Sequence, residues 1–361
     1  MKVLVGLSGG VDSSAVAYLL KKAGHDVIGA TMRIWDKDTD FGSSLKAKGC
    51  FSAHQEEDIE LAKKVAQTLD IPYHVFDCSE EYKRVVLANF KSEYLSGRTP
   101  NPCVICNSSI KFDVLPKTAK ANGLLFDKFA TGHYASVKFN ENNCRYQLFK
   151  GLEKQRDQSY FLYRLNQEQL ENVLMPLGEY SKAEVREFAK MAGLGVANKK
   201  DSQDFYGGNI NDILHQESIK GNFVTTDGRI LGQHNGIWNY TIGQRRGMQI
   251  AAPKPLYVLE IRQNTNEVVV GFAEEADCLG LIADNVNWVS IDRLYEEKIV
   301  SVKTRSAQEP FEAMVRPAED NKIEVKFLEP QKAVAPGQSV VMYDNDMVLG
   351  GGFIEKPKNE F

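Results

Sequence analysis

Residues 2–14 read KVLVGLSGGVDSS, a short apolar run followed by a turn rich in glycine and hydroxyl groups. The run Lys2–Leu7 is typical of a buried strand, because it is apolar, short and bounded by glycine. Beyond the turn, apolar residues between 11 and 20 recur at helical spacing. A strand, a glycine-rich turn and a helix in this order predict the first unit of a parallel α/β sheet.

The same alternation of strand and helix continues through the first third of the chain. Parallel strands joined by helices of this length form sheets that are covered on both faces. The expected strands are 2–7, 27–32, 73–78 and 129–134, and the expected helices are 11–20, 56–69, 80–95, 167–174 and 182–194.

The pattern changes after about residue 205. Gly, Asn and Asp clusters separate short strands at 221–224, 257–261 and 267–270. From 278 the chain is almost entirely short alternating strands, expected at 299–304, 312–315, 322–327, 339–343 and 348–354, which favours a small β-barrel. The sequence therefore predicts an α/β domain at 1–205, a small central domain at 206–277 and a C-terminal β-barrel domain at 278–361.

Composition limits the classes of protein that the chain could belong to. The 361 residues carry a net charge of −4, which excludes a broadly basic nucleic-acid coat and leaves local patches for any polyanion. No apolar run reaches the ~20 residues of a membrane span. We therefore expect a cytoplasmic protein that does not associate with a membrane. In a reducing compartment the six cysteines, at 50, 78, 103, 106, 144 and 278, do not form a disulfide framework.

The turn Ser8–Ser14 has the chemistry of an anion site. Two glycines let the backbone approach an anion closely. The N–H groups at the start of the helix and several hydroxyls point toward the same place. The Gly-Lys-Ser/Thr ending of the ATP-hydrolysing P-loop is absent, so the turn is suited to a pyrophosphate. Asp12 is then a ligand of Mg²⁺, or an N-cap. The alternative is a glycine-rich turn without a ligand.

The motif SGGVDS resembles the pyrophosphate-loop signature of enzymes that split ATP into AMP and pyrophosphate, the adenine nucleotide α-hydrolase-like proteins. Further stretches resemble one family among them, the tRNA-specific 2-thiouridylases, and occur in that family's order over nearly the whole chain. They are ATMRIWD (30–36), GRTPNP (97–102), CNSSIKF (106–112), ATGHYA (130–135), RDQSYFLY (156–163), KKDSQD (199–204), YTIGQRRG (240–247) and APGQS (335–339).

This resemblance implies an enzyme that replaces the 2-carbonyl oxygen of the wobble uridine of tRNA with sulfur. ATP adenylates the oxygen, and a cysteine persulfide, loaded by a cysteine desulfurase or a sulfur-relay protein, supplies the sulfur. Cys106 matches the family's main catalytic cysteine. The matching ATP positions are Gly6, Leu7, Ser8, Gly9, Gly10, Val11, Asp12, Ser13, Met32 and Gly132. The matching tRNA positions are His133, Asp157, Gln158, Ser159, Arg305, Ser306 and Gln338.

Other roles remain open for several of these residues. Met32 also fits a core position, and His133 fits a hydrogen-bonded histidine at a strand end. The run Arg156–Ser159 reads equally as a solvated turn. Gln244, Arg245 and Arg246 lie beside Tyr240 and a glycine-rich turn, so they are either RNA contacts or surface polar groups.

The sequence departs from the family at two positions. Most relatives carry an aspartate where Cys103 stands, and a second catalytic cysteine where Tyr206 stands. Four interpretations of the Cys103/Cys106 pair follow: a zinc site, unrelated structural thiols, an iron–sulfur cluster with a third ligand such as Cys50, or a sulfur carrier with its resolving thiol. The fourth predicts a lowered pKa for the first thiol. The last two both assign the pair to sulfur transfer. The expected catalytic residues are therefore Cys106, Cys103 and, in the nucleotide loop, Asp12.

Two other functions also remain. The loss of a cysteine at position 206 would suit a tRNA-binding sulfur-relay protein without thiolation activity, although such a protein has no need of a pyrophosphate loop. Another adenylating enzyme, such as a tRNA-lysidine synthase, would keep the loop but would not need the cysteine pair.

Overall fold

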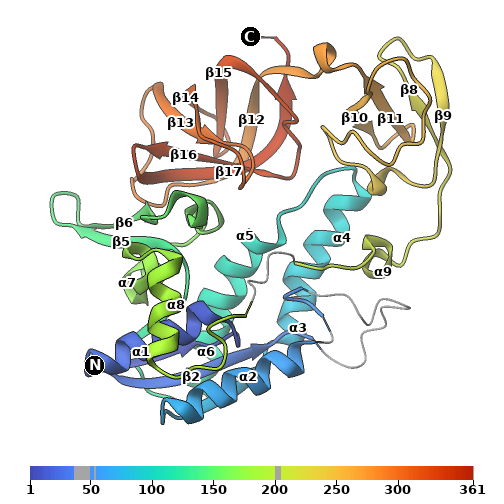
Figure 1. Cartoon of the computed structure of the whole chain (residues 1–361). Coiled ribbons are helices and arrows are strands. Elements are labelled where there is room, and N and C mark those ends of the chain that lie inside the picture. The colour runs from blue at the N-terminus through green and yellow to red at the C-terminus, as the bar shows by residue number, and fades with distance from the viewer. Residues whose placement is uncertain (36–48, 53, 200–204, 361) are drawn as a thin grey trace.

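The computed structural model describes residues 1–35, 49–52, 54–199 and 205–360 (Figure 1). Its first sheet has five parallel strands in the order β3-β2-β1-β4-β7. Their bounds are β1 Lys2–Gly6, β2 Asp26–Arg33, β3 Tyr73–Asp77, β4 Lys128–Ala130 and β7 Val173–Leu174. The prediction of a parallel sheet is confirmed. The strand expected at 129–134 ends at Ala130, because the chain then turns across the carboxyl edge of the sheet.

Helices cover both faces of this sheet, as the strand alternation requires. Val3 and Val5 pack with α1, α2 and α8, while Leu4 packs with the helices between residues 79 and 121. The helices of this region are α1 Val11–Lys22, α2 Gln55–Thr68, α3 Ser79–Tyr82, η1 Lys83–Leu87, α4 Ala88–Leu95, α7 Gln167–Asn172 and α8 Lys182–Met191.

The cysteine pair lies on a helix that the sequence did not predict. α5 Pro102–Cys106 continues through the π-helical turns of η2 Asn107–Val114 into α6 Leu115–Ala121. Asn101 caps it, accepting from Val104 N at 3.4 Å, and Pro102 is the first helical residue. Pro102 thus stands at the first position of the helix, where a missing N–H costs nothing. The π-helical segment starts directly after Cys106, and such segments are frequent at functional sites.

A second sheet, of four strands, forms between residues 221 and 271. Its order is β10-β11-β8-β9, with β8 Gly221–Val224, β9 Ile230–His234, β10 Tyr257–Arg262 and β11 Glu267–Gly271. The short helix α9 Ile210–Leu214 precedes it. Phe223, Trp238 and Val268 are buried in its own small core.

The C-terminal strands close into a barrel. Six strands follow in the order β12-β15-β14-β13-β16-β17, and β12 pairs with β17 to complete the circle. Their bounds are β12 Asp277–Asn287, β13 Lys298–Lys303, β14 Phe311–Ala318, β15 Lys322–Lys332, β16 Ser339–Asp344 and β17 Met347–Lys358. The predicted barrel is confirmed. β12 was missed because Gly280, Asp284 and Asn285 interrupt its apolar alternation.

A hairpin that follows β4 in the sequence extends the barrel, which the sequence did not indicate. β5 Ala135–Asn140 and β6 Arg145–Lys150 pair with each other, and β6 pairs with β17 at Leu148↔Val348. β12 occupies the same edge of β17 only from Gly351 onward, which leaves the start of β17 for β6. The barrel therefore cannot be removed without exposing β6.

The predicted domain boundaries at 205 and 277 remain predictions. Among the helices in the described part of the chain, none has the length and apolar character that crossing a membrane requires.

The junction of the hairpin and the barrel yields a first prediction. The hydroxyl of Ser290 is fully buried and accepts from Leu148 N at 2.8 Å. Ser290→Ala should lower the free energy of unfolding by about 1–3 kcal/mol, since a buried N–H loses its acceptor. Urea denaturation measures it, with the exposed Ser218→Ala as control. Equal stability of the two variants would contradict this account of the junction.

Candidate functional site

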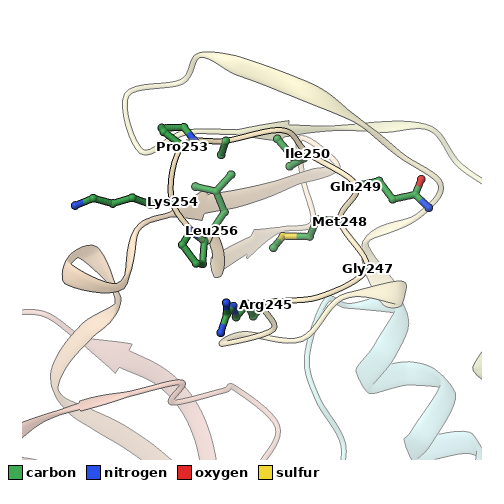
Figure 2. A pocket seen from close by; sticks show the side chains of 10 residues that line it. Arg245, Gly247, Met248, Gln249, Ile250, Pro253, Lys254 and Leu256 are labelled. Atoms are coloured by element: carbon green, nitrogen blue, oxygen red, sulfur yellow. The ribbon is translucent and has the colours of Figure 1, made fainter.

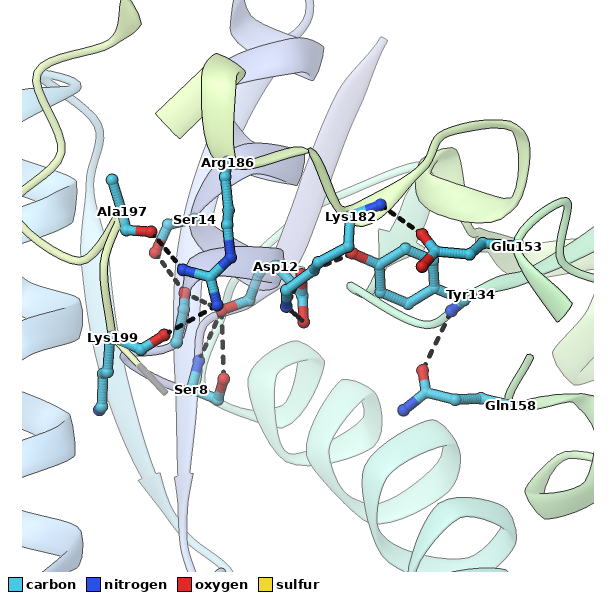
Figure 3. A network of polar contacts seen from close by, with 12 residues as sticks. Ser8, Asp12, Ser14, Tyr134, Glu153, Gln158, Lys182, Arg186, Ala197 and Lys199 are labelled. Carbon is cyan, nitrogen blue, oxygen red and sulfur yellow. Dashed lines mark hydrogen bonds and ion pairs between the residues drawn. The ribbon is translucent and has the colours of Figure 1, made fainter. Parts of the chain in front are cut away.

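The turn between β1 and α1 is a compact loop of hydroxyls and backbone groups. Ser8 N donates to Ser13 Oγ at 3.1 Å, and Ser14 Oγ donates to the Gly10 carbonyl at 2.7 Å (Figure 3). Gly9 has φ +67°, and a Cβ there would lie 2.4 Å from the Asp58 carbonyl. The loop is therefore preformed, and only glycine fits at position 9.

Gly132, just beyond β4, lies against this loop. A Cβ at Gly132 would come within 2.8 Å of Ser13 N and 2.9 Å of the Asp12 carbonyl carbon. The approach brings the carboxyl ends of two neighbouring strands, β1 and β4, together at the start of α1. This is where ligands bind in open parallel sheets, and the N–H groups at the helix start suit an anion. The residues present therefore fit the phosphates of a nucleotide.

The carboxylate of Asp12 is held by a nearly buried lysine. Lys182 Nζ lies 2.8 Å and 2.9 Å from the two oxygens of Asp12, and Tyr134 OH donates to Asp12 at 2.8 Å (Figure 3). The Lys182 side chain is 8% exposed. Sequence reasoning missed Lys182, because 170 residues separate it from its partner.

A second lysine reaches the loop from the same direction. Lys199 Nζ donates to the Gly9 carbonyl at 3.1 Å and pairs with Asp58 at 2.5 Å. Arg186, on α8, donates to the carbonyls of Ala197 and Lys199 and so ties this segment down. Lys199 opens the predicted KKDSQD motif, but the rest of that motif, residues 200–204, lies outside the described residues.

Met32 lies at the end of β2, partly buried against the core. Gln55 Nε2 donates to the Met32 carbonyl at 3.4 Å. Gln55 Oε1 in turn accepts from the backbone N–H groups of Ile34 and Trp35, at 2.9 Å each. Met32 thus shares the carboxyl edge of the sheet with the loop, as an adenine contact would require. The last residue of the ATMRIWD motif, Asp36, lies outside the described residues.

Cys103 and Cys106 lie one turn apart on α5 and are not joined by a disulfide. Burial raises the pKa of Cys103 to about 11 and that of Cys106 to about 12, while Lys111 opposes the shift at both thiols. The expectation of a lowered pKa for the first thiol was therefore wrong for the protein without its ligands: removal of water from the thiols outweighs the nearby lysine.

Lys111 lowers, through its charge, the pKa of both cysteines and that of His133. It is the basic residue of the IKF segment, and after burial it is the second influence that lowers the pKa of His133. His133 is 8% exposed, and its Nδ1 lies 2.8 Å from the Thr131 hydroxyl. The lowered pKa keeps the buried imidazole neutral, and its Nδ1 is bonded to Thr131.

The barrel holds the segment that leads into the cysteine helix. Gln338 Nε2 donates to the carbonyls of Thr99 and Pro100, at 3.1 Å each. Thr99 N in turn donates to the Pro336 carbonyl at 2.8 Å. The APGQS motif therefore positions the turn before Cys103 from more than 200 residues away, which the sequence alone does not reveal.

The other predicted tRNA residues differ in accessibility. Ser159 is fully buried and donates both its backbone N–H and its hydroxyl to the Asp157 carboxylate. Gln158 Oε1 accepts from Tyr134 N at 3.0 Å. Arg305 donates to the Ile242 carbonyl at 2.7 Å and so joins the barrel to the central sheet. Ser306, half-buried, follows it in the turn after β13.

Gln244 and Arg245 lie in the turn of the central sheet. Gln244 bonds within this turn, accepting from Thr241 N and donating to the Arg246 carbonyl. Arg245 is exposed and lines a hollow of about 400 Å³ with Lys254 and apolar residues that include Met248 and Leu256 (Figure 2). A cation beside an apolar surface suits RNA, because the cation can pair with a phosphate while the apolar surface packs against a base.

Comparisons with known proteins agree with this architecture. Residues 1–206 match the family model described as the tRNA methyl transferase HUP domain, 209–272 the tRNA methyl transferase PRC-barrel domain, and 278–354 the aminomethyltransferase beta-barrel domain. The tRNA-specific 2-thiouridylase MnmA of Endomicrobium trichonymphae is 48% identical over 356 residues, 98% of this chain and 99% of that relative.

A second relative, the tRNA-specific 2-thiouridylase MnmA of Acetivibrio thermocellus, is 46% identical over 361 residues, 98% of this chain and 99% of its own. Among solved structures, an NMN synthetase from Francisella tularensis aligns with a TM-score of 0.33 and 17% identity, over 55% of this chain and 65% of that chain, which is too slight a similarity to support an argument.

The parallel sheet, its loop and the closed barrel define a pyrophosphate-loop protein of the adenine nucleotide α-hydrolase type with a C-terminal barrel. Within that class, the chain belongs to the tRNA-specific 2-thiouridylase family.

The raised thiol pKa values predict how the cysteines react. The folded state favours the protonated thiols. Their contribution to the free energy of unfolding is therefore fully present below the ordinary thiol pKa, and it is lost as the pH rises through their folded-state pKa values of about 11 and about 12. At pH 8 iodoacetamide should therefore alkylate Cys103 and Cys106 far more slowly than the exposed Cys144. Peptide mass spectrometry over time measures the three rates, and urea-unfolded protein serves as control. Equal rates in the native protein would refute the burial argument.

Proposed function

We propose that this protein thiolates the 2-position of the wobble uridine of tRNA in an ATP-dependent reaction, as a tRNA-uridine 2-sulfurtransferase of the cytosol. The observation that carries this proposal is the preformed loop Ser8–Ser14 against Gly132, on the same sheet edge as His133, which lies near Lys111 of the helix that carries the cysteines. Family membership supports the same reaction, because the relatives are named tRNA-specific 2-thiouridylases.

The loop binds ATP, with Gly6 to Ser13, Met32 and Gly132 as its contacts. When bound, ATP supplies an adenylyl group that turns the 2-carbonyl oxygen of uridine into part of a leaving group. The backbone N–H groups at the start of α1 hold the pyrophosphate, and Lys182 and Lys199 contribute positive charge nearby. Both oxygens of Asp12 already bond to Lys182 and one also accepts from Tyr134, so Asp12 would hold the accompanying Mg²⁺ through the lone pairs that these bonds leave.

Cys106 carries the sulfur as a persulfide. Its terminal sulfur attacks C2 of the activated uridine, the C2–O bond breaks, and the oxygen leaves with AMP. Cys103, one helical turn away, then attacks Cys106 Sγ, which frees the 2-thiouridine and leaves a Cys103–Cys106 disulfide. A cellular dithiol returns the two electrons. The persulfide comes from a cysteine desulfurase or a sulfur-relay protein.

An iron–sulfur cluster is the other source of sulfur that the sequence suggested. Within the described ranges, no three His, Cys, Asp or Glu side chains are placed to hold a metal ion. We therefore derive no step through a cluster.

The tRNA would contact all three parts of the chain. Arg245, Gln244, Arg305 and Ser306 lie in the central sheet and the barrel, while Gln338 and the turn Asp157–Ser159 adjoin the catalytic edge. Since Gln338 and Ser159 bond within the protein, we assign them to shaping the tRNA surface and leave the phosphate contacts to the exposed arginines.

The first prediction for this function separates its two half-reactions. Asp12→Ala and Ser13→Ala should abolish release of AMP and pyrophosphate in the presence of tRNA, because both side chains belong to the loop. Cys106→Ser should abolish 2-thiouridine but keep pyrophosphate release. A pyrophosphate assay and nucleoside mass spectrometry read the two steps, with Cys144→Ser as control. Normal pyrophosphate release from both loop variants would refute the adenylation step.

The second concerns the central sheet. Arg245→Ala should weaken tRNA binding and reduce the slope of log K against log salt concentration by about 1, as the loss of one phosphate contact does. Filter binding between 50 and 300 mM KCl measures it. Lys298→Ala, on the barrel and paired with Asp344 at 2.7 Å, is the matched loss of a cation. An unchanged slope would remove Arg245 from the interface.

A further inference from the structure

A third cysteine, Cys50, lies beside the pair on α5. It is exposed, and it belongs to the short segment 49–52 that precedes α2. Within that segment Ser52 Oγ donates to the Gly49 carbonyl at 3.0 Å, and Gln55 N donates to the Ser52 carbonyl at 3.1 Å. These bonds form a tight turn that fixes the backbone of Cys50.

The residue after Cys50 anchors this turn in the core. Phe51 is fully buried and stacks on Tyr82 at 5.3 Å and on Phe205 at 5.9 Å between ring centroids. Phe51 N also donates to the Phe205 carbonyl at 3.1 Å. Since a buried, stacked aromatic ring holds its neighbours in place, Cys50 cannot move far from Tyr82.

Tyr82 is the common neighbour of three thiols. It is 1% exposed, and it packs in the same core cluster as Val104 and Cys106. Burial raises its pKa well above the ordinary value, and the thiols of Cys106, Cys50 and Cys103 add to that rise. Cys50 likewise adds to the raised pKa of Cys103. Phe51 thus places the backbone of Cys50 beside Tyr82, in the cluster against which Cys106 packs, and Cys50 is exposed to solvent.

We propose that Cys50 is the first sulfur acceptor of this protein: it takes sulfane sulfur from a protein-bound persulfide and passes it to the Cys103/Cys106 pair. Cys103 and Cys106 are half-buried on a helix clamped by the barrel, whereas Cys50 is presented at the surface on a fixed turn. A macromolecular donor reaches the exposed thiol, and the short remaining distance is crossed inside the protein. This proposal rests on the function proposed above.

The transfers balance without an added oxidant or reductant. The thiolate of Cys50 attacks the terminal sulfur of the donor persulfide, the donor S–S bond breaks, and the donor leaves as a thiolate with the electron pair. A thiolate of the pair then attacks the terminal sulfur on Cys50, and Cys50 leaves as a thiolate in the same way. One sulfur atom moves twice, and no group is oxidised or reduced overall.

The test follows the sulfur atom without tRNA or ATP. A cysteine desulfurase supplied with [³⁵S]cysteine is the probe, and rapid alkylation followed by peptide mapping locates the label. In the Cys103→Ser/Cys106→Ser double variant, the label should stop at Cys50. In Cys50→Ser, labelling of Cys106 by the desulfurase should be lost, while glutathione persulfide, a small donor, should still load Cys106. Cys144→Ser, which removes the other exposed cysteine, should label like the unchanged protein.

Labelling of Cys106 in Cys50→Ser at the unchanged rate would overturn the proposal. So would iron in anaerobically purified protein that is lost in Cys50→Ser, because Cys50 would then be a cluster ligand. Pyrophosphate release with tRNA is measured in parallel. If Cys50 is labelled but tRNA never elicits pyrophosphate, the proposed tRNA thiolation fails while the sulfur relay stands.

Discussion

The ion pair between Asp12 and Lys182 is the constraint on which the rest of the site depends. It joins the nucleotide loop at the start of α1 to the start of α8, across 170 residues of sequence, and Tyr134 adds a third contact from the edge of β4. Losing one partner of a buried pair costs about 3–5 kcal/mol, and the cost here is smaller because the Asp12 side chain is 28% exposed. With α8 fixed in this way, Arg186 and Lys199 come to lie over the loop. Two lysines thus lie beside a site whose proposed ligand is a polyanion.

A second set of contacts links the site to the barrel and the central sheet, the parts of the chain proposed to contact tRNA. The turn of the barrel at Pro336–Gln338 bonds to Thr99 and Pro100, directly before the helix that carries Cys103 and Cys106. Arg305 ties the same barrel to the central sheet. Any tRNA that shifts the barrel therefore acts on the position of the cysteines. This arrangement gives a physical route by which correct substrate binding could align the sulfur with its target, without a separate regulatory site.

The sequence was sufficient to predict the parallel sheet and the barrel, but not the long-range contacts between side chains. Strand β1 and the loop after it were predictable, because an apolar run, two glycines and a helical period leave few alternatives. The cysteine helix was not, since its start depends on the cap that the Asn101 side chain makes and on Pro102 at its first position. Lys182, Lys199 and Gln338 act on partners 140 residues or more away, so local pattern carries no trace of their pairing. The pKa of Cys103 was misjudged for a related reason: its burial depends on how the chain packs around it, which spacing does not reveal.

The central claim is that the 2-carbonyl oxygen of uridine is activated by adenylation and leaves with AMP. The most direct measurement uses tRNA whose wobble uridine carries ¹⁸O at the 2-position, incubated with the protein, ATP and a persulfide donor. Mass spectrometry of the released AMP should find one ¹⁸O atom for each 2-thiouridine formed, because the C2–O bond breaks and the P–O bond to that oxygen remains. AMP without ¹⁸O, alongside newly formed 2-thiouridine, would contradict the account.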